Sequence, residues 1–194
     1  MTPPALDLKA STDQRDVDAL LSLPETGWDK KISADLIGEM EFYLADKVTT
    51  IPQMRQILAV KGYECLLRRI EIDVEGKSGP DAVRAMAAAM RNFALERPGL
   101  SSATFRTPAS DSPAWRRAGA EVFAAALHVF KQVGLEGQPA EQAVGILRSL
   151  VRGSVISEIS ASFFIEPSEY QRTYDLAVEV FILGLPALLG PTAP

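Results

Sequence analysis

Few residues in this chain could carry out chemistry by themselves. The 194 residues include one histidine, His128, and one cysteine, Cys65. Motifs such as H-E-x-x-H need two histidines, and a cysteine zinc site or an internal disulfide needs several cysteines. No paired carboxylates or nucleophile–base set has an interpretable spacing. The sequence therefore predicts no catalytic residues, no metal and no cofactor, and Cys65 is expected to be an inert core thiol.

A second group of side chains suits the binding of apolar molecules. The alanine- and methionine-rich run "DAVRAMAAAMRNFALERPGL" brings Met86, Met90 and Phe93 together between small residues. Flexible thioethers adapt to guests of varied shape, and alanines leave room beside them. By spacing alone, however, these three side chains fill a core as readily as they line a cavity.

Proline and glycine mark the helices that position these residues. Pro80, Pro113, Pro139 and Pro167 each precede an amphipathic run, and proline suits the first helical position. Glycine is expected to end four of the helices as a C-terminal cap, at Gly76, Gly99, Gly134 and Gly190. Helices are predicted at about 52–75, 80–97, 113–134, 139–164 and 168–189. No strand alternation or Gly-rich phosphate loop interrupts them, which predicts an all-α fold.

The final predicted helix is apolar nearly all round, so it needs cover on two sides. The hydrophobic core of the same chain would cover one side. A two-fold partner chain would supply the other, in a four-helix dimer interface made by the last two helices. The alternative is packing within one chain. The expected interface residues are Val151, Val155, Ile159, Tyr174, Val178, Phe181, Ile182 and Leu185.

Composition and charge constrain the class of protein. A hydrophobic fraction of 47% with 23% charged residues is ordinary for a soluble domain. The most apolar segment, "FILGLPALLG", is too short to span a bilayer, and no secretory signal opens the chain. We therefore expect a cytoplasmic protein. Residues 1–55 hold six Lys or Arg against ten Asp or Glu. This segment therefore carries −4 of the chain's net charge of −5.

Several stretches resemble the TetR/AcrR family of bacterial transcriptional regulators. They are "AMAAAMRNFALERPGL", "AWRRAGAEVFAAALHVFKQVGL", "AVGILRSLVRGSVISE" and "YDLAVEVFILGL". The likeness covers roughly residues 56–189 and is closest to the C-terminal ligand-binding and dimerisation domain named for a Trp-His-Gly motif. Here Val151-Arg152-Gly153 stands in place of that motif, so no role of its Trp or His is carried over.

The resemblance implies a TetR-like helical bundle and a ligand-responsive transcriptional regulator or repressor that works as a homodimer. Residues 52–194 would form the ligand-binding and dimerisation domain, in which the alanine- and methionine-rich helix is a cavity wall. The implied ligand is a small apolar or aromatic molecule. Its expected contacts are Tyr63, Met86, Met90, Phe93, Phe105, Trp115, Phe123 and His128. Among them Tyr63, Trp115 and His128 would supply the polar contacts.

Residues 1–51 occupy the place of the family's helix-turn-helix domain but diverge from its usual pattern. The DNA-contacting residues, if this segment binds operator DNA, would be Lys30, Lys31, Tyr43 and Lys47. Glu39, Glu41 and Asp46 would then lie where phosphates sit and oppose binding. One continuous helix from about 29 to 48 is the alternative. The second functional class is therefore a TetR-like sensing or interaction domain that has lost DNA binding.

Overall fold

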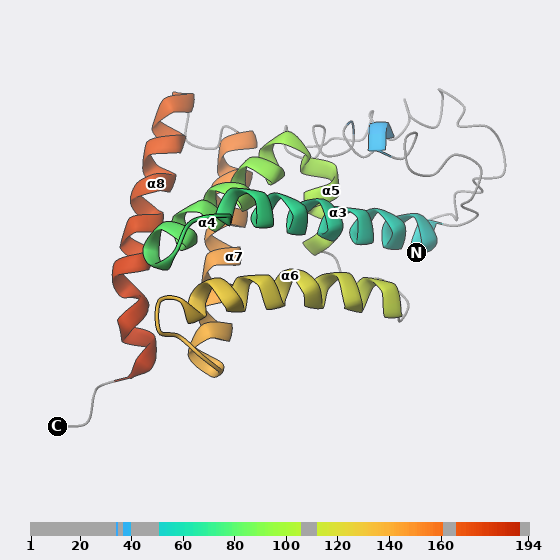
Figure 1. Cartoon of the computed structure of the whole chain (residues 1–194). Helices are drawn as coiled ribbons and strands as arrows, with labels where there is room; N and C mark the ends of the chain where they lie inside the picture. The colour runs from blue at the N-terminus through green and yellow to red at the C-terminus, as the bar shows by residue number, and fades with distance from the viewer. Residues whose placement is uncertain (1–33, 35–36, 40–50, 106–111, 161–165, 191–194) are drawn as a thin grey trace, which may run out of the picture.

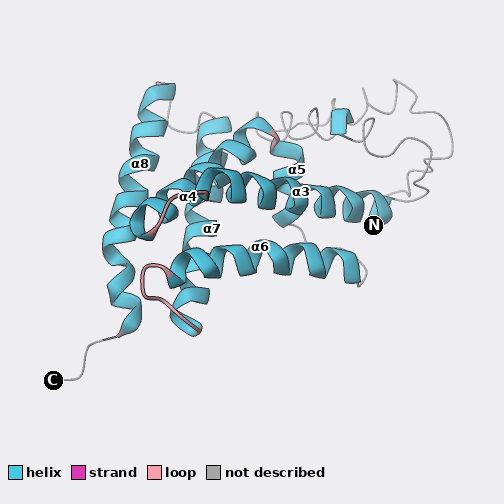
Figure 2. Ribbon diagram, viewed as in Figure 1, coloured by secondary structure: helices cyan, strands magenta, loops and turns pink. Residues whose placement is uncertain are grey.

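The described part of the protein is built from helices. The structure, a computed structural model, describes residues 34, 37–39, 51–105, 112–160 and 166–190. Its main helices are α3 (Ile51–Val74), α4 (Gly79–Glu96), α5 (Pro98–Phe105), α6 (Pro113–Lys131), α7 (Gln138–Ile159) and α8 (Pro167–Gly184), followed by the short 3₁₀ helix η1 (Leu185–Leu189). Figure 2 shows helices joined by short loops, with no strand among these residues. The predicted all-α fold is confirmed.

The proline pattern locates the helix starts well. A proline occupies the first or second position of α4, α6, α7 and α8. Before α6, the Ser112 hydroxyl accepts a hydrogen bond from the backbone N–H of Trp115 at 3.2 Å, which satisfies one free donor of the first turn. Gly76 and Gly134 follow helices with φ of 72° and 83°, a left-handed conformation that glycine adopts without strain.

Three helix boundaries differ from the prediction. Gly99 is the second residue of α5 and not a cap, because Pro98 starts a new helix directly after Arg97. The short helix α5 was therefore missed. The last helix changes at Leu185 into a 3₁₀ turn, since Pro186 has no N–H to continue the α-helical hydrogen bonds. Helix α7 ends at Ile159, and residues 161–165 lie outside the described part.

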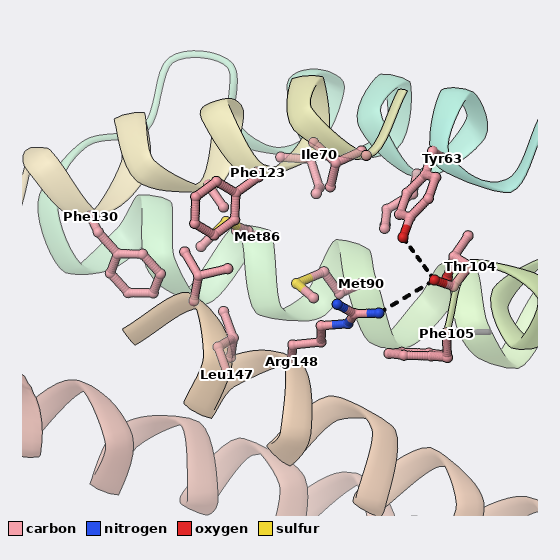
Figure 3. Close-up of a pocket in the computed structure, with 15 residues that line it drawn as sticks. Tyr63, Ile70, Met86, Met90, Thr104, Phe105, Phe123, Phe130, Leu147 and Arg148 are labelled. Carbon is pink, nitrogen blue, oxygen red and sulfur yellow. Dashed lines mark hydrogen bonds between the residues drawn. The ribbon is translucent and has the colours of Figure 1, made fainter. Parts of the chain in front are cut away.

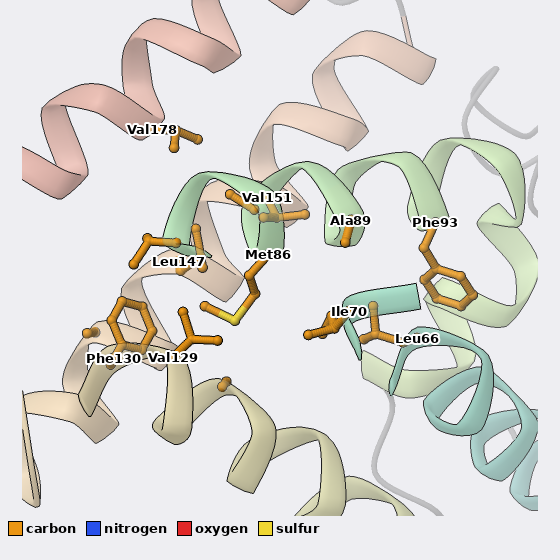
Figure 4. Packing of buried hydrophobic residues seen from close by; sticks show 14 of the residues in the cluster. Leu66, Ile70, Met86, Ala89, Phe93, Val129, Phe130, Leu147, Val151 and Val178 are labelled. Atoms are coloured by element: carbon orange, nitrogen blue, oxygen red, sulfur yellow. The ribbon is translucent and has the colours of Figure 1, made fainter. Parts of the chain in front are cut away.

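The helices pack around one hydrophobic core. Helices α3 and α6 lie side by side, with α4 and α5 packed against α3 (Figure 1). Helix α7 packs on α4 and α6, and α8 lies against α7 and α4 at one edge of the molecule. Figure 4 shows Met86, Phe130 and Leu147 meeting between α4, α6 and α7, where all three are fully buried. Burying apolar side chains of this size supplies most of the driving force for folding.

Helices α3 and α5 approach each other closely at Gly62. A Cβ atom there would lie 2.7 Å from the backbone oxygen of Leu100 and 2.7 Å from Cγ2 of Thr104. Because backbone cannot easily give way, glycine sets the spacing between these two helices. This contact places Thr104 and Phe105, at the end of α5, beside α3.

Candidate ligand cavity

An apolar cavity of about 100 Å³ lies between α3, α4, α5, α6 and α7. Figure 3 shows its walls. Its deeper part is formed by side chains that belong to the core, among them Met86, Phe130 and Leu147. Phe123 of α6, which lies near Met86 and Phe130, also lines the cavity and is 39% exposed, so it borders solvent as well (Figure 3). The remaining lining residues are Tyr63, Leu66, Ile70, Met90, Thr104, Phe105, Gly119, Val122, Ala126, Val144 and Arg148.

One end of this cavity is polar. The Tyr63 hydroxyl donates a hydrogen bond to the Thr104 backbone oxygen at 2.7 Å, and Nη2 of Arg148 donates to the same oxygen at 3.3 Å (Figure 3). The Arg148 guanidinium also lies 4.8 Å from the centre of the Phe105 ring. Burial raises the pKa of the Tyr63 hydroxyl, and the charge of Arg148 partly opposes this rise. Tyr63 is therefore a neutral donor near pH 7.

Five of the eight residues expected to contact a ligand line this cavity. They are Tyr63, Met86, Met90, Phe105 and Phe123. Ligand binding by these residues stays a prediction. The structure brings them together from four helices, α3, α4, α5 and α6, of which α5 was not predicted.

The other three residues lie elsewhere. Phe93 is buried in the core cluster but does not line the cavity. Trp115 packs edge-on against Tyr63, with ring centres 6.4 Å apart, and so supports a lining residue from behind. His128 is exposed, because it lies two residues from both Ala126 and Phe130 and thus on the opposite face of α6. These three assignments were wrong for this cavity.

Two polar contributors were missed. Arg148 is four residues after Val144 and one after Leu147, so it borders the inward face of α7. The Thr104 carbonyl lies in the last turn of α5, a helix that was not predicted, and there it accepts hydrogen bonds from Tyr63 and Arg148. The periodicity of α7 could have revealed Arg148, but the residues singled out on this helix, Val151, Val155 and Ile159, were assigned to the dimer interface.

The residues assigned to that interface need correction. Five of them are buried within the single chain, so a partner cannot contact them: Val151, Val155, Tyr174, Val178 and Leu185. Ile159, Phe181 and Ile182 are partly buried against the same core. The apolar side chains of α8 that face outward are instead Leu176, Val180 and Leu183, at 64%, 62% and 79% exposure. The prediction chose the most apolar face of α8, which covers the chain's own core.

The residues expected to contact DNA, Lys30, Lys31, Tyr43 and Lys47, lie outside the described part, as do Glu41 and Asp46. Glu39 is described and is 7% exposed. Its carboxylate accepts hydrogen bonds from the guanidinium of Arg97, the residue between α4 and α5. The expectation that Glu39 would face DNA phosphates was therefore wrong, because an internal cation neutralises it.

The described residues thus form an all-α domain with an apolar cavity between five helices. The family model for the tetracyclin repressor-like C-terminal domain matches residues 83–181, half of the chain, and the chain belongs to this family of TetR-type transcriptional regulators. A curated protein of Mycobacterium tuberculosis, described as an uncharacterised HTH-type transcriptional regulator, is 27% identical over 146 residues. That alignment covers 73% of this chain and 67% of the relative. Within the described residues, no helix has the length and apolar character needed to cross a membrane.

Proposed function

We propose that this chain is a ligand-responsive transcriptional repressor that acts as a homodimer on operator DNA. The observation that carries the proposal is the cavity that α3 encloses together with helices of the matched residues 83–181. A small apolar or aromatic molecule would bind there, in contact with Met86, Met90 and Phe123. Residues 1–51 would form a divergent DNA-binding head, and residues 52–194 the sensing and dimerisation domain. Because its target is chromosomal DNA, we place its action in the cytoplasm.

The ion pair between Glu39 and Arg97 supports a route from the cavity to the head. Helix α4 carries Met86 and Met90 on the cavity wall and ends at Glu96, one residue before Arg97. A ligand that displaces α4 or α5 would move Arg97 and with it the segment that holds Glu39. A difference of about 1–3 kcal/mol between the two states is enough for useful allosteric control. In a dimer, the shift would change the separation of two heads that must match half-sites about 34–36 Å apart.

The test is a low-salt mobility shift with DNA that flanks the protein's own gene. The doubly substituted Lys30→Glu/Lys31→Glu variant should lose retardation of all sequences tested, because lysines bind phosphates without reading bases. A matched control, Lys131→Glu/Arg172→Glu, makes the same change in net charge at exposed positions of α6 and α8. It should bind as the wild type does. Equal loss in both variants would mean that only total charge matters and would count against a DNA-binding head.

The second candidate function is a sensing domain that no longer binds DNA. The observation that favours it is the acidic balance of residues 1–55, six basic against ten acidic residues. Non-specific DNA binding comes mainly from neutralised phosphates, and repressors show it at micromolar protein and low salt. Absence of any retardation by the wild-type dimer at about 50 mM salt would therefore favour this second candidate.

A further inference from the structure

The polar end of the cavity holds the cationic side chain of Arg148, for which the described residues supply no counter-anion. Arg148 reaches the Thr104 carbonyl through one long hydrogen bond of 3.3 Å, and its guanidinium stacks near the Phe105 ring. Within the described residues, no carboxylate forms an ion pair with Arg148. Arg148 is an exposed residue whose charge also acts on the Tyr63 hydroxyl. A guanidinium has five N–H donors, so with respect to the described residues several of them are open to solvent or to a ligand.

A second guanidinium lies beside the first. Arg152, one turn further along α7, lies 4.9 Å from the centre of the same Phe105 ring. It too has no carboxylate partner in the part of the chain that is described. Like charges four residues apart on a helix repel each other, and an anion placed near both relieves the repulsion. Arg152 is exposed and does not line the cavity, but its charge adds to that of Arg148 beside the Phe105 ring, so this end of the cavity attracts an anion.

The rest of the cavity sets the size and character of the other half of a ligand. Away from Arg148 the walls are apolar, with Met86, Met90, Phe123 and Phe130 among them. A dry apolar cavity of about 150 Å³ is known to hold one benzene ring. The cavity here, about 100 Å³ and bounded by flexible thioethers and a partly exposed Phe123, suits a group of one ring after small side-chain movements.

We infer that the cavity selects a small aromatic carboxylate, about the size of benzoate, over neutral molecules of the same shape. This inference rests on the proposed use of the cavity as the ligand site. The ring lies among the methionines and Phe123, and the carboxylate takes the Arg148 guanidinium away from the Thr104 oxygen. Arginine and carboxylate match each other with two parallel hydrogen bonds, which are about twice as strong as neutral ones.

This exchange also connects the cavity to α5. The Thr104 carbonyl would keep its bond from Tyr63 and lose the one from Arg148, so one of the contacts between α7 and the end of α5 would be lost. Helix α5 begins at Pro98, directly after the Arg97 that pairs with Glu39. Capture of the carboxylate by Arg148 thus acts on the helix that leads back to residues 1–51.

The experiment compares benzoate with benzamide, its neutral isostere, by calorimetric titration of the full chain. The wild type should bind benzoate at least about tenfold more tightly, since a hydrogen bond to a charged partner contributes more than a neutral one. Arg148→Gln should bring the two dissociation constants together while benzamide binding persists, which also shows that the variant keeps its cavity. The control is Arg172→Gln, which removes the same charge from an exposed site on α8 and should keep the full preference for benzoate.

Each remaining outcome has a separate meaning. If both compounds bind the wild type equally, the inference is overturned, while the cavity stays a ligand site. If Arg148→Gln keeps the preference for benzoate, the assignment of Arg148 is overturned. If neither compound nor toluene binds, both this inference and the ligand response in the proposed function fail. The mobility shift reports on DNA binding independently of all three results.

Discussion

Arg91 is the most buried charged side chain in the described part of the protein, with 5% exposure. It extends from α4 toward both of the last two helices. Nη2 donates a 2.6 Å hydrogen bond to Glu158 on α7, and Nη1 donates to Gln171 on α8. The guanidinium also lies 5.3 Å from the ring of Tyr174, whose hydroxyl donates to the Ala87 carbonyl at 2.7 Å. Burial raises the pKa of this tyrosine, so it remains a neutral donor.

Removal of the partner of Arg91 should destabilise the protein markedly. In Glu158→Ala, the guanidinium stays buried without its counter-charge, and we expect a loss of about 2–4 kcal/mol in the free energy of unfolding. The matched control is Glu136→Ala, which breaks an exposed ion pair with Lys131. Such surface pairs contribute about 0–1 kcal/mol. Urea denaturation measures both, and equal effects of the two substitutions would contradict a structural role for the Arg91 contacts.

At the scale of helices, the tight contact between α3 and α5 depends on one glycine. Gly62→Ala places a methyl group 2.7 Å from the Leu100 backbone oxygen, so α5 must move or the helices must separate. We expect a loss of about 1–3 kcal/mol, as overpacking in a core usually costs. Thermal unfolding followed by circular dichroism measures it.

The control for this substitution is Gly119→Ala on α6. A Cβ at Gly119 would meet the Tyr63 ring at 3.5 Å, an ordinary van der Waals contact. Alanine is also the better helix former by about 1 kcal/mol, so this variant should be as stable as the wild type or more so. A Gly62→Ala protein with unchanged stability would show that the α3–α5 contact relaxes easily and does not set the position of Thr104.

The extent to which the sequence predicted these elements follows from the range of the interactions involved. Proline starts and glycine ends act within a few residues, so α4, α6 and α7 were found near their observed starts. Helix α5 was missed because the Pro98-Gly99 pair has two local meanings, a stop for one helix and a start for the next. The contacts of Arg91 and Arg148 join residues 67 and 44 positions apart, and no local pattern encodes them.

The faces of α8 show a different limit of prediction. Its apolar residues surround the helix, so periodicity predicts that two sides are covered without saying which one meets a partner. Packing against α4 and α7 then decides that Tyr174 and Val178 face inward. On α6, Phe123 was placed correctly at the cavity and His128 wrongly, because His128 lies two residues from both Ala126 and Phe130 and thus on the opposite face.

At the scale of the whole molecule, the outer face of α8 is the expected dimer contact. Leu176, Val180 and Leu183 recur at intervals of four and three residues and form one exposed apolar stripe. On the neighbouring α7, Ser149 and Gly153 are exposed, and such small residues let a second backbone approach closely. An isologous interface through these faces would bury the stripe against its own copy across a two-fold axis.

The double substitution Leu176→Asp/Val180→Asp tests this interface without damage to the protomer. Because both side chains are mostly exposed in the single chain, the variant should fold normally. It should sediment as a monomer while the wild type sediments as a dimer, since unpaired charges buried in an apolar contact cost several kcal/mol.

Phe181→Asp would be a poorer test, because the Phe181 ring packs edge-on against Phe130, with centres 6.0 Å apart, and its loss disrupts the core. The control is Ile72→Asp, which puts a charge at an equally exposed apolar position on α3 and should stay dimeric. A wild-type monomer, or a dimer that survives both aspartates, would rule out the outer face of α8 as the contact between protomers.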